Sequence, residues 1–176
     1  STRIWEFLDH TYEAMRITPV WQNDTQQQFD HTKQHTEKFL FLKLYPILFA
    51  SDYEDTILNE KLYDRIESLH FLTAEHLEIK YEILEHPISY LRQIEEMKTP
   101  YDKLLCIKRC TMGIASILKT CHSDHSLPGA DELVPMMIYV IKTTNPSHLQ
   151  SNLKYLQRYT RPTAMIGEAG YLLTNF

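Results

Sequence analysis

Glycine is scarce in this chain, which has four glycines among 176 residues. No segment alternates apolar and polar residues over the length of a strand. Sheets are recognised in a sequence by such alternation and by turns rich in glycine. The two absences exclude most β-rich folds and predict an all-α protein.

Cysteines are also few, and long apolar runs and an excess of positive charge are absent. No run approaches the roughly 18 apolar residues of a membrane span, and residues 1–20 have no signal-peptide pattern. The three cysteines are too few for a disulfide framework and fit a reducing compartment. The net charge of −5 argues against nucleic acid, whose phosphates call for a basic surface. We therefore expect a cytoplasmic protein with neither direct membrane insertion nor nucleic-acid binding.

Motifs for metal, nucleotide or covalent chemistry are weak or absent. His31 and His35 stand four apart, a spacing that can chelate a metal, but HTKQH lacks the glutamate of HExxH, so a solvated helix face is favoured. Cys106 and Cys110 are interpreted as small core residues. The 121–125 segment has ligand types but no second cluster. With no P-loop, dinucleotide fingerprint or GxSxG, we expect neither a metal site nor a cofactor.

Charge is unevenly distributed along the chain. Residues 1–98 hold 18 acids against 10 lysines and arginines, whereas residues 99–176 hold 5 against 8. Two of those five acids, Asp131 and Glu132, are adjacent in PGADELVPMMIYVIK (128–142), in front of an almost wholly apolar helix. The position of this pair calls for an explanation.

Helical periodicity and capping residues predict seven main helices. We expect them at residues 3–16, from 23–25 to 45, and at 53–71, 88–97, 99–120, 133–144 and 146–160, with a helical turn at 73–76 and a final element from 167. The second helix is expected to be buried nearly all round in its later part, and Pro46 to bend or end it. We interpret residues 1–50 as a helical bundle packed on a layered core of residues 51–176.

Asp131 allows two interpretations. It could cap the apolar helix, since aspartate satisfies free N–H groups there. However, Pro135 disfavours a helix that begins so early, because proline has no N–H and restricts Val134. A start near Val134 or Pro135 would leave Asp131 and Glu132 on a turn, available to a partner. The motif alone leaves cap and exposed functional acid equally open.

The second half of the chain resembles a known family. PGADELVPMMIYVIKTTNPSHLQSNLKYLQRY, followed by GEAGYLLTN, is similar to the Vps-nine domain, the catalytic module of Rabex-like and plant-type exchange factors for Rab GTPases. The shared pattern is an acid pair, a proline four positions after the key aspartate, an apolar helix, Asn-Pro, a HLxSNLxYI-like stretch and GEAxYxxTN. EKFLFLKLYPILFA, IESLHFLTAEHLEI and PYDKLLCI extend the resemblance over nearly the whole chain. Ser147 departs from it, where many members have a second proline.

The resemblance implies a guanine nucleotide exchange factor that promotes GDP release from an early-endosomal, Rab-five-like GTPase, without covalent chemistry. Asp131 would be an acidic finger near the phosphate and magnesium site, aided by Tyr171. Glu132, Pro135 and Thr174 would contact the GTPase. The family continues into a further helix after Phe176, so the 51–176 core is expected to lack its final helix.

The resemblance also implies a setting and an alternative. Members act in endocytosis and vesicle-mediated transport, in the cytoplasm, with peripheral recruitment to early endosomes. The alternative is a non-catalytic helical adaptor that binds a Rab GTPase. A scaffold of that kind would not need Asp131 and Tyr171 together. A metal-dependent hydrolase built on the histidines has weaker support.

Overall fold

A computed structural model describes residues 2–80, 85–121, 129–166 and 170. Every regular element in these ranges is helical, which confirms the predicted all-α fold. The elements are α1 (Thr2–Ile17), α2 (Gln26–Leu48), α3 (Tyr53–Ser68), α4 (Glu85–Arg92), the 3-10 helix η1 (Gln93–Glu95), α5 (Pro100–Cys121), α6 (Ala130–Thr144), α7 (Leu149–Tyr159) and α8 (Pro162–Met165). Within the described ranges, no helix has the length and apolar character that crossing a bilayer requires.

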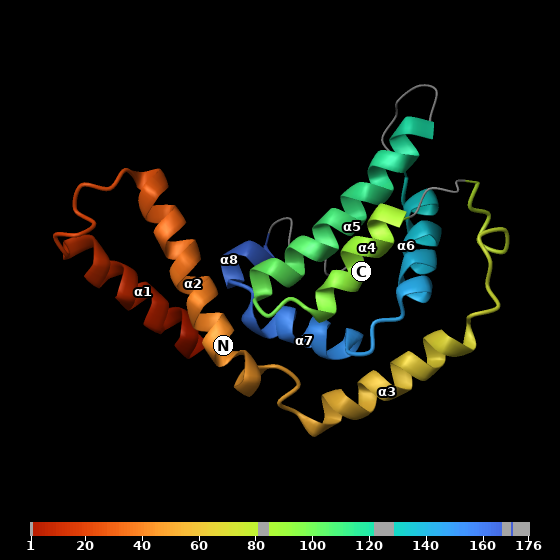
Figure 1. Ribbon diagram of the computed structural model, residues 1–176, viewed down its shortest axis with the longest axis horizontal. Helices are drawn as coiled ribbons and strands as arrows, with labels where there is room; N and C mark the ends of the chain where they lie inside the picture. The colour runs from red at the N-terminus through yellow and green to blue at the C-terminus, as the bar shows by residue number, and fades with distance from the viewer. Residues whose placement is uncertain (1, 81–84, 122–128, 167–169, 171–176) are drawn as a thin grey trace. The chain divides into compact units, whose positions relative to one another are not determined.

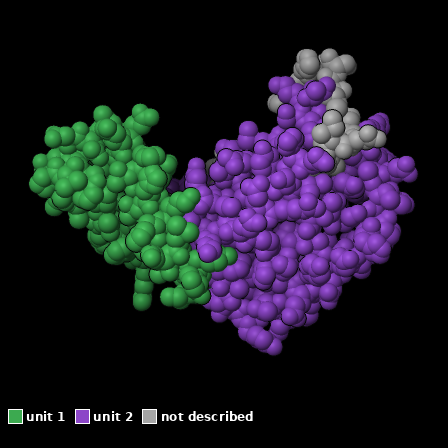
Figure 2. All heavy atoms as spheres, viewed as in Figure 1, with its two compact units in different colours: residues 1–48 green, residues 49–176 purple. Residues whose placement is uncertain are grey.

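The chain divides into two compact units, residues 1–48 and 49–176, coloured separately in Figure 2. The first unit is an antiparallel pair formed by α1 and α2 (Figure 1). The Trp5 and Phe41 rings lie 5.5 Å apart, and the Tyr12 hydroxyl donates to the Glu37 carboxylate at 2.9 Å. From the first contact to the second, the residue number increases on α1 and decreases on α2, so the two helices are antiparallel.

Burial within the first unit differs from the prediction. Four residues form the inner face of α1: Trp5, Leu8, Tyr12 and Met15. Phe7, on the same helix, is 58% exposed. In the later part of α2, Phe41 is buried but Phe39, Leu42 and Ile47 are exposed, so the expected all-round burial is wrong. With one partner helix in the unit, α2 can bury only one stripe.

The second unit is built around α5, which packs against α4, α6 and α7 (Figure 1). Its buried cluster comprises Leu91, Ile94, Cys106, Ile107, Cys110, Ile114, Leu118, Met136, Met137, Val140 and Leu156. These side chains come from α4, η1, α5, α6 and α7. Their removal from water is the main favourable contribution to folding. The two cysteines lie in this cluster, as predicted, and burial raises the pKa of Cys110 to about 12.

The start of α5 follows the predicted capping signal. Thr99 precedes Pro100, the first helical residue. The Thr99 hydroxyl accepts from the Asp102 N–H at 3.1 Å and donates to the Asp102 carboxylate at 2.9 Å. This reciprocal pair satisfies one of the free N–H groups of the first turn.

The second unit also contains α3, which packs on α7. The Asp52 carboxylate accepts from the Glu54 N–H at 3.1 Å and begins the helix, as predicted. One turn further, Arg158 Nη1 of α7 donates to the buried Asp55 carboxylate at 3.0 Å. The bond between Asp55 and Arg158 joins positions 103 apart in the chain.

Lys103 is fully buried in the second unit. Its Nζ donates to the Ile94 carbonyl at 2.7 Å and to the Asn152 amide oxygen, and lies 4.8 Å from the centre of the Phe49 ring. Burial lowers the pKa of Lys103 to about 8, and the charge of Glu95 partly opposes that shift. The amine links the segment before α5 to α7.

Candidate functional site

The acid pair lies in the first turn of α6 rather than on a turn before it. Gly129 is the N-cap, so Asp131 and Glu132 are the second and third helical residues. The predicted start at Val134 or Pro135 is therefore wrong. A helix that begins at Ala130 loses only the bond from position 135 to the Asp131 carbonyl. Because Asp131 is exposed, that carbonyl can bond to solvent instead.

The two acids have different roles at the helix end. The Glu132 carboxylate accepts from the Gly129 N–H at 3.3 Å, which is the back-bonding half of a capping box. Asp131 is exposed, and its carboxylate makes no hydrogen bond or ion pair within the described ranges. Glu132, and not Asp131, thus has the capping role. Asp131 remains as an exposed acid at the positive end of a helix, a favourable location for negative charge.

One face of α6 is buried in the core and another is exposed. Met136, Met137 and Val140 point into the core. Val134 and Ile138 are 46% and 42% exposed. They follow Asp131 at three and seven positions, the spacing of one helix face. We call Asp131, Val134 and Ile138 the exposed stripe, an acid at the tip followed by two apolar side chains.

The far end of α6 is held by α3 and by the segment after it. Lys142 Nζ donates to the Leu72 carbonyl at 2.8 Å and to the His70 carbonyl at 3.4 Å. The helix ends at Asn145, whose left-handed conformation (φ 36°) is one that asparagine tolerates. Its Nδ2 donates to the Tyr63 carbonyl at 3.3 Å and to Glu67 at 3.2 Å. These contacts fix the helix that carries the stripe.

The structure places three of the five predicted site residues. Asp131, Glu132 and the half-buried Pro135 share the first two turns of α6. Tyr171 and Thr174 lie outside the described residues. Within the described ranges, no group of three or more histidines, cysteines, aspartates or glutamates could hold a metal ion.

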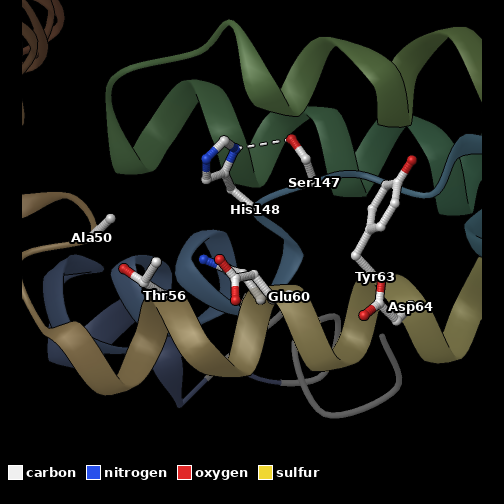
Figure 3. Close-up of a pocket in the computed structure, with 8 residues that line it drawn as sticks. Ala50, Thr56, Glu60, Tyr63, Asp64, Ser147 and His148 are labelled. Carbon is white, nitrogen blue, oxygen red and sulfur yellow. Dashed lines mark hydrogen bonds between the residues drawn. The ribbon is translucent and has the colours of Figure 1, made fainter.

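A pocket of about 540 Å³ lies elsewhere on the second unit, beside α3 and the turn between α6 and α7. Figure 3 shows Ser147 and His148 on one side of it, across from Glu60 and Tyr63 on α3. The His148 ring is held by the Glu95 carboxylate, 2.9 Å from Nδ1. None of the five predicted site residues lines this pocket.

The model of the Vacuolar sorting protein 9 (VPS9) domain family matches residues 84–176, which is more than half of the chain. The chain belongs to the VPS9 domain family. The match contains α4 to α8 and the whole exposed stripe. The resemblance inferred from the acid pair and the Asn-Pro motif is thereby confirmed.

Several proteins are similar to this VPS9 chain over more than the matched segment. Vacuolar protein sorting-associated protein 9A of Arabidopsis thaliana is 35% identical over 181 residues, 98% of this chain and 35% of that protein. Vacuolar protein sorting-associated protein vps901 of Schizosaccharomyces pombe is 29% identical over 97% of this chain and 32% of that protein. Rab5 GDP/GTP exchange factor of Mus musculus is 32% identical over 79% of this chain and 30% of that protein. The chain spans about a third of the length of these relatives.

The sequence draws attention to the acids of the exposed stripe and its first turn, but not to the apolar side chains of the stripe. The notable position of Asp131 is visible in the sequence. The exposure of Val134 and Ile138 is not, because every residue from 133 to 141 is apolar and periodicity cannot say which face packs inward. No sequence signal pairs Lys142 with the carbonyls of His70 and Leu72 either, since that contact joins positions 70 and 72 apart.

Proposed function

We propose that the chain is a guanine nucleotide exchange domain that promotes GDP release from a Rab GTPase of the Rab-five-like branch. Its membership of the VPS9 family supports this proposal, as does its similarity to a mouse protein named Rab5 GDP/GTP exchange factor. The exchange reaction depends on binding energy, and no covalent bond is formed or broken in the protein.

The observation that carries the proposal is the exposed carboxylate of Asp131 at the tip of α6. It is not used as a cap, whereas its neighbour Glu132 is. A helix can gain about 0.3–1 kcal/mol from an acid in its first turn, and Glu132 already supplies one. A second acid that protrudes into solvent beside two apolar side chains suits recognition of a positively charged partner group.

The chemistry of GTPases supplies such a group. They hold nucleotide through P-loop amides, a lysine on the β- and γ-phosphates and a magnesium ion. We infer that the Asp131 carboxylate enters this region, repels the phosphates and pairs with the lysine once the nucleotide leaves. The empty GTPase is thereby stabilised relative to the GDP-bound form. Because binding favours the state without nucleotide, release of GDP accelerates.

The apolar part of the stripe would hold the GTPase while the acid acts. Val134 and Ile138 can bury switch-loop side chains, each contributing on the order of 1.5 kcal/mol if fully covered. Pro135, between the acid and Ile138, would shape the same surface. Tyr171 would contact a switch loop, and Thr174 would support the contact. Glu132 would act mainly by fixing the first turn from which Asp131 projects.

The cellular setting follows from the same proposal. An exchange domain for a Rab-five-like GTPase would act in the cytoplasm and be recruited peripherally to early endosomes. Sorting in endocytosis would be the process served.

Release of fluorescent GDP from a panel of Rab GTPases, with and without this chain, tests the proposal. We expect release from a Rab-five-like GTPase to accelerate in proportion to the concentration of the chain. Stable binding of the GTPase without accelerated release would instead identify a non-catalytic adaptor. Acceleration confined to Rab GTPases of other branches would refute the assigned substrate and leave the exchange activity standing.

A further inference from the structure

The first unit carries a pair of histidines that the proposed exchange reaction does not use. His31 and His35 are one turn apart on α2, and both are exposed. Their Nε2 atoms lie 3.3 Å apart, and their rings are nearly perpendicular, with centres 4.4 Å apart. The two nitrogens thus lie next to each other at the helix surface.

This separation equals the bite of a tetrahedral metal ion. Two imidazole nitrogens bound to one Zn²⁺ at 2.0–2.1 Å with tetrahedral angles lie about 3.3–3.4 Å apart. A shared proton is the competing occupant of the gap. The hydrogen bond between the two rings is 3.3 Å long, slightly beyond the usual 2.7–3.2 Å range, and is therefore weak. A metal can therefore replace it once the exposed rings turn so that both lone pairs point to one centre, which moves the ring centres further apart than 4.4 Å.

The surroundings define what kind of metal site this is. The nearby Asp30 carboxylate is bonded to Gln26 at 2.9 Å and to Lys33 at 3.3 Å. No third histidine, cysteine or acid in the described part of the chain joins the pair. Two coordination positions would thus be filled by water or by an outside donor. An open site of this type exchanges its metal, unlike the closed four-ligand sites that stabilise small folds.

We propose that His31 and His35 form an exchangeable site for a zinc-class divalent transition metal on α2. Imidazole nitrogen favours zinc, copper and nickel, whereas magnesium and calcium favour oxygen ligands. Magnesium, which a GTPase requires, would therefore not bind at this site. Occupancy would clamp one turn of α2 through its side chains.

The test is a Zn²⁺ titration of the whole chain, followed by calorimetry and by side-chain NMR of the histidines. We expect the Nε2 resonances of His31 and His35 to shift together. His35→Gln removes one ligand but keeps a good helix former. Its apparent affinity for the shifted site should fall at least about tenfold. His10→Gln, on the exposed face of α1, removes one unpaired histidine and should leave the affinity unchanged.

Three outcomes would overturn the proposal. The first is zinc binding that leaves the His31 and His35 resonances unmoved, which would place the metal elsewhere, for example at the 121–125 segment. The second is equal affinity in wild type and His35→Gln. The third is an equal response to excess Mg²⁺. GDP release should be the same in wild type, His35→Gln and His10→Gln, so the result does not depend on the proposed exchange activity.

Discussion

Asn59 and Ser151, 92 positions apart, exchange two hydrogen bonds in the interior of the second unit. Asn59 Nδ2 donates to Ser151 Oγ at 2.7 Å, and the Ser151 N–H donates to Asn59 Oδ1 at 2.9 Å. Both side chains are buried. The family match begins at residue 84, yet this pair makes α3, at residues 53–68, an integral part of the same folding unit.

Asn59→Ala should therefore destabilise the second unit by about 1–3 kcal/mol, because the buried Ser151 groups lose their partners. Urea unfolding followed by circular dichroism would measure this change. The exposed Lys61→Ala, half a turn away on α3, is the matched control and should stay within about 0.5 kcal/mol of wild type. Equal stability of Asn59→Ala and Lys61→Ala would mean that α3 adds little to the fold.

Asp131→Asn should melt like wild type and catalyse GDP release poorly. Loss of a charge paired in a desolvated interface costs about 2–5 kcal/mol, or roughly 30-fold to several thousandfold in rate. Asp131→Ala should behave alike. Glu132→Ala should affect the rate less and the stability more, by about 1 kcal/mol, because Glu132 holds the Gly129 N–H. GDP release by Asp131→Asn at the wild-type rate would refute the acidic-finger assignment.

Ile138→Ser and Val140→Ser should separate the two faces of α6. Ile138 is exposed, so its substitution should leave stability near wild type but raise the half-saturating GTPase concentration about tenfold. Val140 is fully buried, and its substitution should cost about 2–3 kcal/mol of unfolding free energy. Exchange titrations and thermal melts on both variants supply the comparison. An unaltered exchange titration curve for Ile138→Ser would show that the exposed stripe is not part of the interface with the GTPase.

Tyr171→Ala should slow exchange roughly 30-fold, the rate equivalent of an interface residue worth about 2 kcal/mol. A tyrosine ring at an interface supplies contact area and its hydroxyl a hydrogen bond. The melting temperature should remain close to that of wild type. If stability and exchange activity fall together, Tyr171 is a core residue instead.

Lys103 should make stability depend on alkaline pH. Its pKa is about 8 in the fold and about 10.4 in an unfolded chain. Between these values the unfolded chain binds more protons than the fold, so this residue makes unfolding free energy rise with pH there. The rise is on the order of 3 kcal/mol in total. The difference in unfolding free energy between wild type and Lys103→Met, measured by urea unfolding at pH 7 to 10, isolates this rise. The contributions of the other titrating groups cancel in that difference. A flat difference would show an amine unperturbed by folding, and a falling difference would show a pKa raised by folding.

The sequence predicted the helices well wherever local chemistry decides. Thr99 and Asp102 bond as the capping pattern indicates, and Asp52 begins α3. The start of α6 was predicted wrongly because the cost of Pro135 was overestimated. One missing hydrogen bond is tolerable at an exposed helix end. Burial was predicted wrongly on α2, because the sequence does not state how many neighbours a helix has.

Contacts between distant segments were beyond sequence reasoning altogether. Lys103 looks like an ordinary surface lysine by type, and only the fold brings the Ile94 carbonyl and Asn152 to its amine. The sequence places His31 and His35 four positions apart, but the 3.3 Å separation of their Nε2 atoms depends on the ring rotamers. The division of α6 into a core face and an exposed face likewise requires the neighbouring helices.

The anchoring of α6 at one end has a mechanical consequence. The helix is about 22 Å long, and its C-terminal end is bonded to α3 through Asn145 and to residues 70 and 72 through Lys142. A force on the N-terminal end of the helix, at Asp131, is thus transmitted along the helix to these contacts with another part of the chain. The buried face of α6, with Met136, Met137 and Val140, supports the helix along its length as well. In the proposed complex, loosening the C-terminal contacts would therefore let the Asp131 end move when a GTPase binds.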